Sequence, residues 1–294
     1  MKYQGHKMGK YIISYSLWGN TPMYTIGAIR NAEQAKEIYP DWICRFYVGD
    51  DVSKHIVSKL QSFDNTEVIV MPHKENDWRG MFWRFYAVDA NDDSEYVIFR
   101  DTDSRLSSRE YEAIREWFHS GKYFHIMRDH PYHSEAIQGG MWGCKPKELL
   151  DKINKEVYAK HNLSKVSNLE DVIRDWIRNE KRKTEHEIGN FISEEKYNEK
   201  GIDQNFLGSL LYPLVYKEAF IHDSYPMYNC YSGRFDYQYN PKGKETNTGF
   251  PTKRAGDWNN FVGQVYDEND VPSQEYADVV KQRDECLYAD WGTL

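Results

Sequence analysis

Short runs of apolar, β-branched and aromatic residues alternate with segments of helical periodicity along the first half of the chain. Such runs predict buried strands at 11–18, 42–48 and 67–71, and in the run that begins at Tyr96. Helices are predicted between these strands, and they are 22–38, which begins with Pro22 after Thr21, then 55–63 and 80–89. Alternation of strand and helix is typical of a mainly parallel sheet with helices on both faces.

The alternation continues beyond residue 105 and then loosens. Ser107 and Glu110 have the spacing of a capping box, so a helix is predicted up to Gly121. The later expected elements are a strand at 123–127, helices at 146–160, 168–178 and 202–211, and a strand at 219–222. Charged residues dominate 179–200, which predicts an exposed insertion or loop, and 228–251 has the composition of irregular structure. Without a repeat or an evident linker, we expect one compact unit.

Composition is that of a globular protein with many aromatic residues. Of the 294 residues 40% are hydrophobic and 29% charged, while 15% are aromatic, including 23 Tyr and 9 Trp. Aromatic rings fill cores, and they also stack on nucleobases and on the apolar faces of sugars. The formal net charge of -8 argues against a chain built to hold a nucleic acid by its phosphates, whereas a small phosphorylated ligand needs only a local positive site.

Cysteine usage and the lack of long apolar segments bear on the compartment. The cysteines are scattered without a Cys-x-x-Cys pair, which indicates reduced thiols rather than a zinc site or a disulfide framework: Cys44, Cys144, Cys230 and Cys286. The first residues lack the apolar segment of a signal peptide, and no later run approaches the length of a membrane span. We therefore expect a cytoplasmic protein without a transmembrane segment, and peripheral association with a membrane stays open.

The run that begins at Tyr96 ends in two carboxylates one residue apart, Asp101 and Asp103. Ligands of open α/β sheets gather outside the carboxyl ends of the strands. Carboxylate oxygens, water and phosphate oxygens together are the ligands of hard divalent cations. The motif indicates a metal-bridged phosphate, although two aspartates at a strand end can also cap backbone amides or face water.

Four further segments could supply the rest of such a site. Residues 14–19 place small polar groups at the end of the first strand, and Arg84 could hold a phosphate through two parallel hydrogen bonds. The glycine pair within 138–143 permits close approach of the backbone to a ligand. Asp203 stands at a helix start, and His222 could complete an Asp, Asp, His set suited to manganese. Each segment also has a plain structural explanation, as a strand turn, a surface arginine, a tight turn or a core histidine.

In this order the motifs resemble those of the nucleotide-sugar-dependent glycosyltransferases of the GT-A fold. The resemblance covers about 10–223, and it rests on Asp101-Thr102-Asp103, the segment 138–143, Asp203-Gln204 and His222. It implies an α/β fold of GT-A type in which a nucleotide-binding half, 10–105, merges with a donor-sugar and acceptor half, 106–294. It also implies transfer of a sugar from a UDP- or GDP-sugar to a hydroxyl of a carbohydrate or glycoconjugate acceptor, in glycan or surface polysaccharide synthesis.

The resemblance implies roles for individual residues as well. Asp101, Asp103 and His222 would hold Mn²⁺ or Mg²⁺, and Asp203 would be the general base of an inverting reaction or would hold donor-sugar hydroxyls in a retaining one. The residues implied to contact the nucleotide sugar are Ser14, Ser16, Leu17, Trp18, Arg84, Asp101, Thr102, Gln138, Gly139, Gly140, Trp142, Gln204, Lys253 and Arg254. Among them, Trp142 would stack on a sugar ring, and the last two would close over the diphosphate. The nearby histidines match no usual metal-ligand spacing, and they are His125, His130 and His133.

Other functions fit parts of the pattern. A phosphatase of the haloacid dehalogenase type would use Asp101 as its nucleophile, but in that class the Asp-x-Asp motif normally opens the domain. A sugar nucleotidyltransferase would need a glycine-rich basic loop, which is missing after the first strand. A non-catalytic carbohydrate-binding protein would use the aromatic residues and would have no need for paired carboxylates at a strand end.

Overall fold

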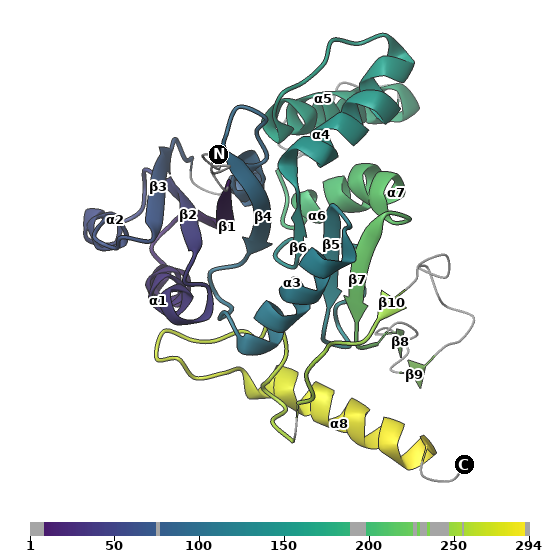
Figure 1. The fold of residues 1–294 in the computed structure, drawn as a ribbon. Helices are drawn as coiled ribbons and strands as arrows, with labels where there is room; N and C mark the ends of the chain where they lie inside the picture. Colours follow the sequence, from purple (N-terminus) through teal and green to yellow (C-terminus); the bar gives the residue numbers. More distant parts are fainter. Residues whose placement is uncertain are drawn as a thin grey trace, which may run out of the picture.

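The computed structural model describes residues 9–74, 77–188, 198–225, 228–229, 234–235, 247–254 and 256–291. Its centre is an eight-stranded sheet in the order β10-β7-β5-β6-β4-β1-β2-β3, and β8 pairs with β9 separately (Figure 1). The strands are β1 (Lys10–Leu17), β2 (Trp42–Gly49), β3 (Thr66–Met71), β4 (Ser94–Arg100), β5 (Phe124–Arg128), β6 (Trp142–Cys144), β7 (Ala219–Asp223), β8 (Tyr228–Asn229), β9 (Arg234–Phe235) and β10 (Asn247–Thr248).

The main sheet is parallel apart from its short central strand. β6 runs antiparallel to both of its neighbours, β4 and β5, while β1 pairs in parallel with β2 and with β4. The pairs β2 with β3, β5 with β7 and β7 with β10 are parallel too. The predicted α/β class with a mainly parallel sheet is confirmed. The carboxyl ends of β1, β4 and β5 therefore lie at one edge, where ligands of such sheets bind.

Helices cover both faces of the sheet (Figure 1). They are α1 (Pro22–Ile38), α2 (Lys54–Gln61), α3 (Ser108–Ser120), α4 (Pro146–Ile153), α5 (Leu169–Ile188), α6 (Ile202–Phe206), α7 (Tyr212–Val215) and α8 (Gln274–Trp291), with the 3₁₀ helix η1 (Trp78–Ala87). A π-helical turn (Asn154–Tyr158) and a 3₁₀ turn (Ala159–His161) follow α4, and a π-helical turn (Leu207–Leu211) follows α6. Neighbouring strand residues belong to different cores: Ile12 packs with η1 and α4 to α6, and Ile13 packs with α1 and α3. This follows from the alternation of side chains along a strand.

Several local expectations need correction. The segment predicted as a helix at 80–89 is a 3₁₀ helix. The charged stretch predicted as an insertion from 179 is helical as far as Ile188, because glutamate, lysine and arginine are good helix formers; its residues 189–197 lie outside the described part. The strand β6 and the helix α8 were not predicted at all. Three residues are too few to show a strand period.

The predicted capping box at the start of α3 is formed by one of its two residues. Ser107 accepts a hydrogen bond from the Glu110 backbone N–H, but the Glu110 carboxylate turns inward to Arg100 Nε, at 2.6 Å, and to the Tyr39 hydroxyl, at 2.9 Å. The capping box is thus only half formed, because a buried arginine competes for the carboxylate.

Within the part of the chain that is described, no helix is long and apolar enough to cross a membrane.

Candidate active site

A cavity of about 170 Å³ lies beyond the carboxyl end of β4. It is lined by eight of the residues that the sequence singles out, namely Arg84, Asp101, Asp103, Gln138, Gly139, Gly140, Asp203 and Gln204. These come from η1, the end of β4, the loop before β6, and α6. Residues separated by more than a hundred positions along the chain therefore meet at one place.

Arg84 is the centre of the charges at this cavity. Its guanidinium donates to the Asp101 carboxylate and, at 2.7 Å, to Asp203 Oδ2. The side chains of Arg84 and Asp203 are 5% and 0% exposed, whereas that of Asp101 is 48% exposed. Burial disfavours the charge of Arg84, but the two carboxylates outweigh it and raise the pKa of the guanidinium. Arg84 is thus a fixed cation between one buried and one accessible carboxylate.

Two carboxyl groups at the cavity, those of Asp103 directly after β4 and of the buried Asp203 on α6, have raised pKa values. Burial, and then the charge of Asp101, raises the pKa of Asp103 to about 6. Burial also raises the pKa of Asp203, and Arg84 only partly opposes the shift. Asp203 Oδ1 is buried and has no hydrogen-bond partner among the described residues. A cation near Asp103, or a hydroxyl near Asp203, would satisfy these groups.

Gly139 and Gly140 allow the backbone to touch this ion network. A Cβ atom on Gly139 would lie 2.5 Å from Arg84 Nη2 and 2.6 Å from Asp203 Oδ2. A Cβ atom on Gly140 would overlap the Asp101 carboxylate and lie 2.9 Å from the Asp101 backbone nitrogen. The glycine pair lies in a turn that the Met141 N–H closes onto the Gln138 carbonyl at 3.1 Å, and the close approach to the charged side chains explains why both positions lack a side chain.

We expect replacement of Gly140 by alanine to disrupt the site. The Asp101 backbone next to the new methyl group belongs to the end of β4 and has little freedom to move, so overpacking should cost about 1 to 3 kcal/mol of stability and displace the Asp101 carboxylate. Gly208 offers a matched control, because a Cβ there meets nothing within 4 Å. Thermal melts of both alanine variants check this, and equal melting temperatures would contradict it.

Ser14 and Ser16 are buried, and their hydroxyls hold the backbone of Arg84 instead of facing a surface that is open to a ligand. The Ser14 hydroxyl donates to the Arg84 carbonyl at 2.7 Å, and the Ser16 hydroxyl accepts from the Arg84 N–H at 2.9 Å. Both therefore fix the arginine backbone from the neighbouring strand β1. The predicted contact of these serines with a nucleotide is replaced by this supporting position, which alternation of side chains along β1 could not reveal.

Other residues that were predicted to contact the ligand are buried or partly buried in the core. Trp142 is fully buried in β6, with its ring centroid 3.9 Å from that of Phe99, so it does not stack on a sugar at this cavity. Leu17 is likewise buried, and the Thr102 carbonyl accepts from Asn31 and Arg105. Trp18 is only partly buried and packs edge-on against Trp83.

His222 does not lie with the aspartates. Its Nδ1 is 2.9 Å from His125 Nε2, and its Nε2 is 2.9 Å from Glu116 Oε2. Both ring nitrogens are engaged in the layer between α3 and the β5–β7 pair, and the residue does not line the cavity. The described residues contain no group of three or more His, Cys, Asp or Glu side chains arranged to hold a metal ion. The predicted Asp, Asp, His set is therefore not assembled here.

Lys253 and Arg254 also lie apart from the cavity. Arg254 binds Asp129 Oδ1 at 2.7 Å and Asp284 Oδ2 at 3.0 Å, and Lys253 is exposed. Arg254 is therefore occupied by carboxylates of the protein. Neither residue lines the cavity, and the diphosphate contact of these two residues stays a prediction.

Of the remaining lining residues, Met141 belongs to the predicted segment 138–143, and His133 was noted only as a histidine without a usual metal-ligand spacing. The sequence did not predict the other four, which are Met81, Ser104, Gly263 and Val265. Ser104 forms an isolated β-bridge with Val265, and the Tyr266 N–H donates to the Asp103 carbonyl at 2.8 Å. The C-terminal segment thus closes one side of the cavity. Its residues are ordinary in type, and a pairing over 160 positions leaves no local sequence signal.

Comparisons with known proteins found matches among solved structures. No family model and no curated protein matches the sequence. Among solved structures, a 4-diphosphocytidyl-2C-methyl-D-erythritol synthase from Anaerococcus prevotii is 12% identical with a TM-score of 0.35, and the match covers 54% of this chain and 87% of that one. The galactosyltransferase LgtC with donor and acceptor sugar analogues is 14% identical with a TM-score of 0.33, covering 53% and 67%.

A glucosyl-3-phosphoglycerate synthase from Mycobacterium tuberculosis in complex with UDP is 13% identical, with a TM-score of 0.31, and the match covers 49% of this chain and 59% of that one. A mycobacterial protein is matched over 55% of its length. The chain thus spans little more than half of these two proteins. At such identities and TM-scores the likeness carries no argument about activity.

Proposed function

We propose that this protein is a metal-dependent glycosyltransferase, which moves a sugar from a nucleoside diphosphate sugar to an acceptor hydroxyl. The convergence of Asp101, Asp103, Arg84 and Asp203 on one cavity at the carboxyl edge of a parallel sheet supports the proposal. The sequence order of these residues is that of the family the chain resembles. Synthesis of glycans or surface polysaccharides is the setting that we propose with it.

The residues at the cavity fit a hard divalent cation, Mn²⁺ or Mg²⁺. Asp103 and Asp101 offer carboxylate oxygens. Burial, and then the charge of Asp101, raises the pKa of Asp103, so a nearby cation would offset the cost of ionising this carboxyl. When bound, such an ion neutralises the diphosphate leaving group as a Lewis acid. Asp101 and Asp103 would hold it.

The side chains around the carboxylates would then orient the donor. Arg84 is held by both its backbone and its guanidinium, so it keeps Asp101 and Asp203 in place and supplies positive charge close to a phosphate. Asp203 Oδ1 would accept a hydrogen bond from a substrate hydroxyl, and its raised pKa makes it a better proton acceptor. Gln138 from the loop before β6 and Gln204 from α6 would contact the sugar.

The size of the cavity limits what it encloses. Pockets that bury a whole ligand of drug size measure about 300–1,000 Å³, so the cavity of about 170 Å³ encloses only part of a nucleotide sugar, and we place the bond between the diphosphate and the sugar there. We place the nucleoside over the open ends of β1 and β2, near the partly buried Trp18.

A panel of nucleotide sugars with Mn²⁺ tests the proposal. We expect one donor class to raise the melting temperature and to be slowly hydrolysed, with both effects lost on addition of EDTA. Metal-independent binding of free glycans without a response to any nucleotide would instead favour a carbohydrate-binding protein. Release of orthophosphate from simple phosphomonoesters, lost in Asp101→Asn, would favour a phosphatase.

A further inference from the structure

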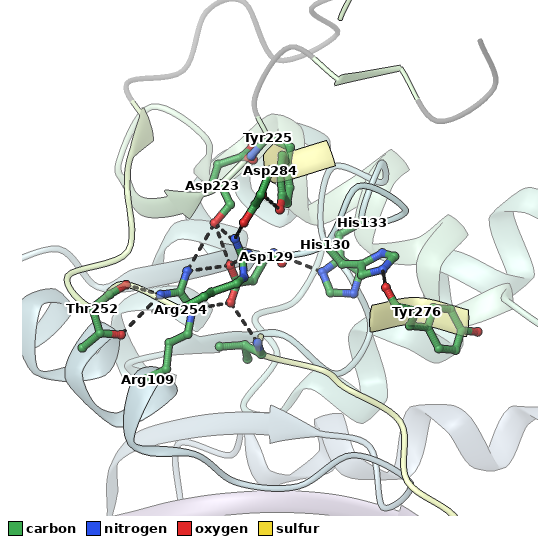
Figure 2. Close-up of polar contacts among 12 residues, drawn as sticks. Arg109, Asp129, His130, His133, Asp223, Tyr225, Thr252, Arg254, Tyr276 and Asp284 are labelled. Carbon is green, nitrogen blue, oxygen red and sulfur yellow. Dashed lines mark hydrogen bonds and ion pairs between the residues drawn. The ribbon is translucent and has the colours of Figure 1, made fainter. Parts of the chain in front are cut away.

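A second buried charge cluster lies next to the cavity, around Asp129 at the end of β5 (Figure 2). Arg109 from α3 donates Nε to Asp129 Oδ2 at 2.6 Å and Nη2 to Oδ1 at 2.8 Å. Arg254 Nη2 and the Ser224 hydroxyl also donate to Oδ1, at 2.7 and 2.6 Å. The side chain of Asp129 is 0% exposed, and these donors overcome its burial and lower the pKa of the carboxyl.

The fifth donor connects Asp129 to the C-terminal side of the cavity. The Val262 backbone N–H donates to Asp129 Oδ2 at 2.9 Å, and the next residue, Gly263, lines the cavity, as does Val265. Arg254 and Thr252 of the same segment are held by Asp129 and by Arg109. The carboxylate thus fastens the segment that forms one wall.

The backbone of Asp129 connects to a second part of the wall. Its N–H donates to His133 Nδ1 at 3.1 Å, and His133 lines the cavity. Because a backbone N–H can only donate, Nδ1 must accept, and the neutral ring carries its proton on Nε2. The Cε1–Nε2 edge lies against Gly263, where an added Cβ would come within 3.3 Å of Cε1 and 3.5 Å of Nε2.

We propose that Asp129 is a positioning residue of the active site, which places the loop 261–265 and holds His133 as an Nε2–H donor at the cavity wall. No single sequence motif marks this role, because the donors come from α3, from Ser224 directly after β7, and from the C-terminal segment. An Nε2–H group at this wall suits an acceptor oxygen of a phosphate or a sugar hydroxyl. That the oxygen belongs to a nucleotide sugar rests on the function proposed above, whereas the positioning rests on the contacts alone.

Two variants test the positioning without any ligand. Asp129→Asn keeps the shape but removes the charge and one acceptor oxygen. Ser224→Ala removes one donor that is not on the loop; its hydroxyl also accepts from Arg109 Nη2 at 3.4 Å and from Arg254 Nη2 at 3.5 Å, so its effect on 261–265 must pass through the cluster around Asp129. Ser120→Ala is the matched control, because its hydroxyl makes a 2.6 Å bond to the Trp117 carbonyl instead. If Asp129→Asn does not fold, Ser224→Ala decides alone.

Two readouts apply to the full-length variants. Hydrogen exchange should become about tenfold faster at 261–265 and at 130–133 in Ser224→Ala and more in Asp129→Asn, with β1 and β2 unchanged. In ¹⁵N-histidine spectra, assigned with His133→Gln, the pure Nε2–H tautomer of His133 should give way to a mixture in Asp129→Asn. Unchanged exchange in the two segments of Ser224→Ala, or changes spread over the whole chain, would overturn the proposal. A failed donor panel alongside the expected exchange would reject the proposed function and leave the positioning role standing.

Discussion

Replacement of Asp103 by asparagine is expected to stabilise the metal-free protein above pH 6 and to abolish metal-supported turnover. The folded-state pKa of Asp103 is about 6, above its ordinary value of 3.8, because of burial and the charge of Asp101. The native state therefore binds the proton more tightly than the unfolded chain, and stability falls as pH rises through this window. Asparagine carries no charge to bury, so the gain at pH 7.5 should be of order 1 to 3 kcal/mol.

The same substitution should remove an essential oxygen ligand. Loss of the Lewis-acid contribution, which is worth several kcal/mol in metal enzymes, should lower donor turnover by about a thousandfold or more. In the wild type, metal-dependent binding of the donor should weaken as pH falls below about 6, because a protonated Asp103 binds cations poorly. Urea melts at pH 5 and 7.5, with turnover assays, check both effects, and the exposed Asp41→Asn serves as control. Turnover like that of the wild type in Asp103→Asn would remove this residue from the ligand set.

Replacement of Arg84 by methionine is expected to destabilise the protein by about 3 to 5 kcal/mol, because it leaves the fully buried Asp203 carboxylate without its cation. Arg79→Met is a control on the same 3₁₀ helix: its 2.6 Å ion pair with Asp77 is 41% exposed on the arginine side, so the loss there should be at most about 1 kcal/mol.

A double variant separates charge from packing. If the cost of Arg84→Met comes from the uncompensated carboxylate, adding Asp203→Asn should recover part of the lost free energy of unfolding, as a positive coupling in a urea-melt cycle. No recovery would assign the loss to packing of the long side chain. Arg84→Met and Asp203→Asn should each also lower donor turnover. In Arg84→Met, Asp101 loses its partner as well.

The sequence predicts the parts of the site that depend on strand ends and residue type. Asp101 and Asp103 follow a clear apolar run, and the carboxyl ends of parallel strands meet, so their place could be foreseen. Arg84, the glycine pair and Asp203 also meet them, through contacts that span up to 119 positions. Their residue types made them candidates, but no local pattern records a contact over this distance, so their meeting could be expected only from the assumed fold.

Several residues that were predicted to line the site lie away from the cavity, and the reason is the direction in which each side chain points. Ser14 and Trp142 are of types that bind ligands, but one supports a backbone carbonyl and the other fills the core. In a strand of three residues the face of a side chain is set by its neighbours in the sheet, and a shift of one position reverses it. His222 and Arg254 found partners within the protein, and their residue types alone are equally consistent with ligand binding.

Val262 follows Asp129 by 133 positions and Arg254 follows it by 125, so the carboxylate meets its last donors only after very long loops have closed. Contacts of this range form late and slowly during folding. A nascent chain that has not yet reached residue 262 holds Asp129 with Arg109 but lacks the wall that Gly263 and Val265 supply. During synthesis, the carboxyl edge of the sheet around Asp101 can therefore fold well before the cavity is complete. Binding of the donor should become possible only when the last part of the chain has folded.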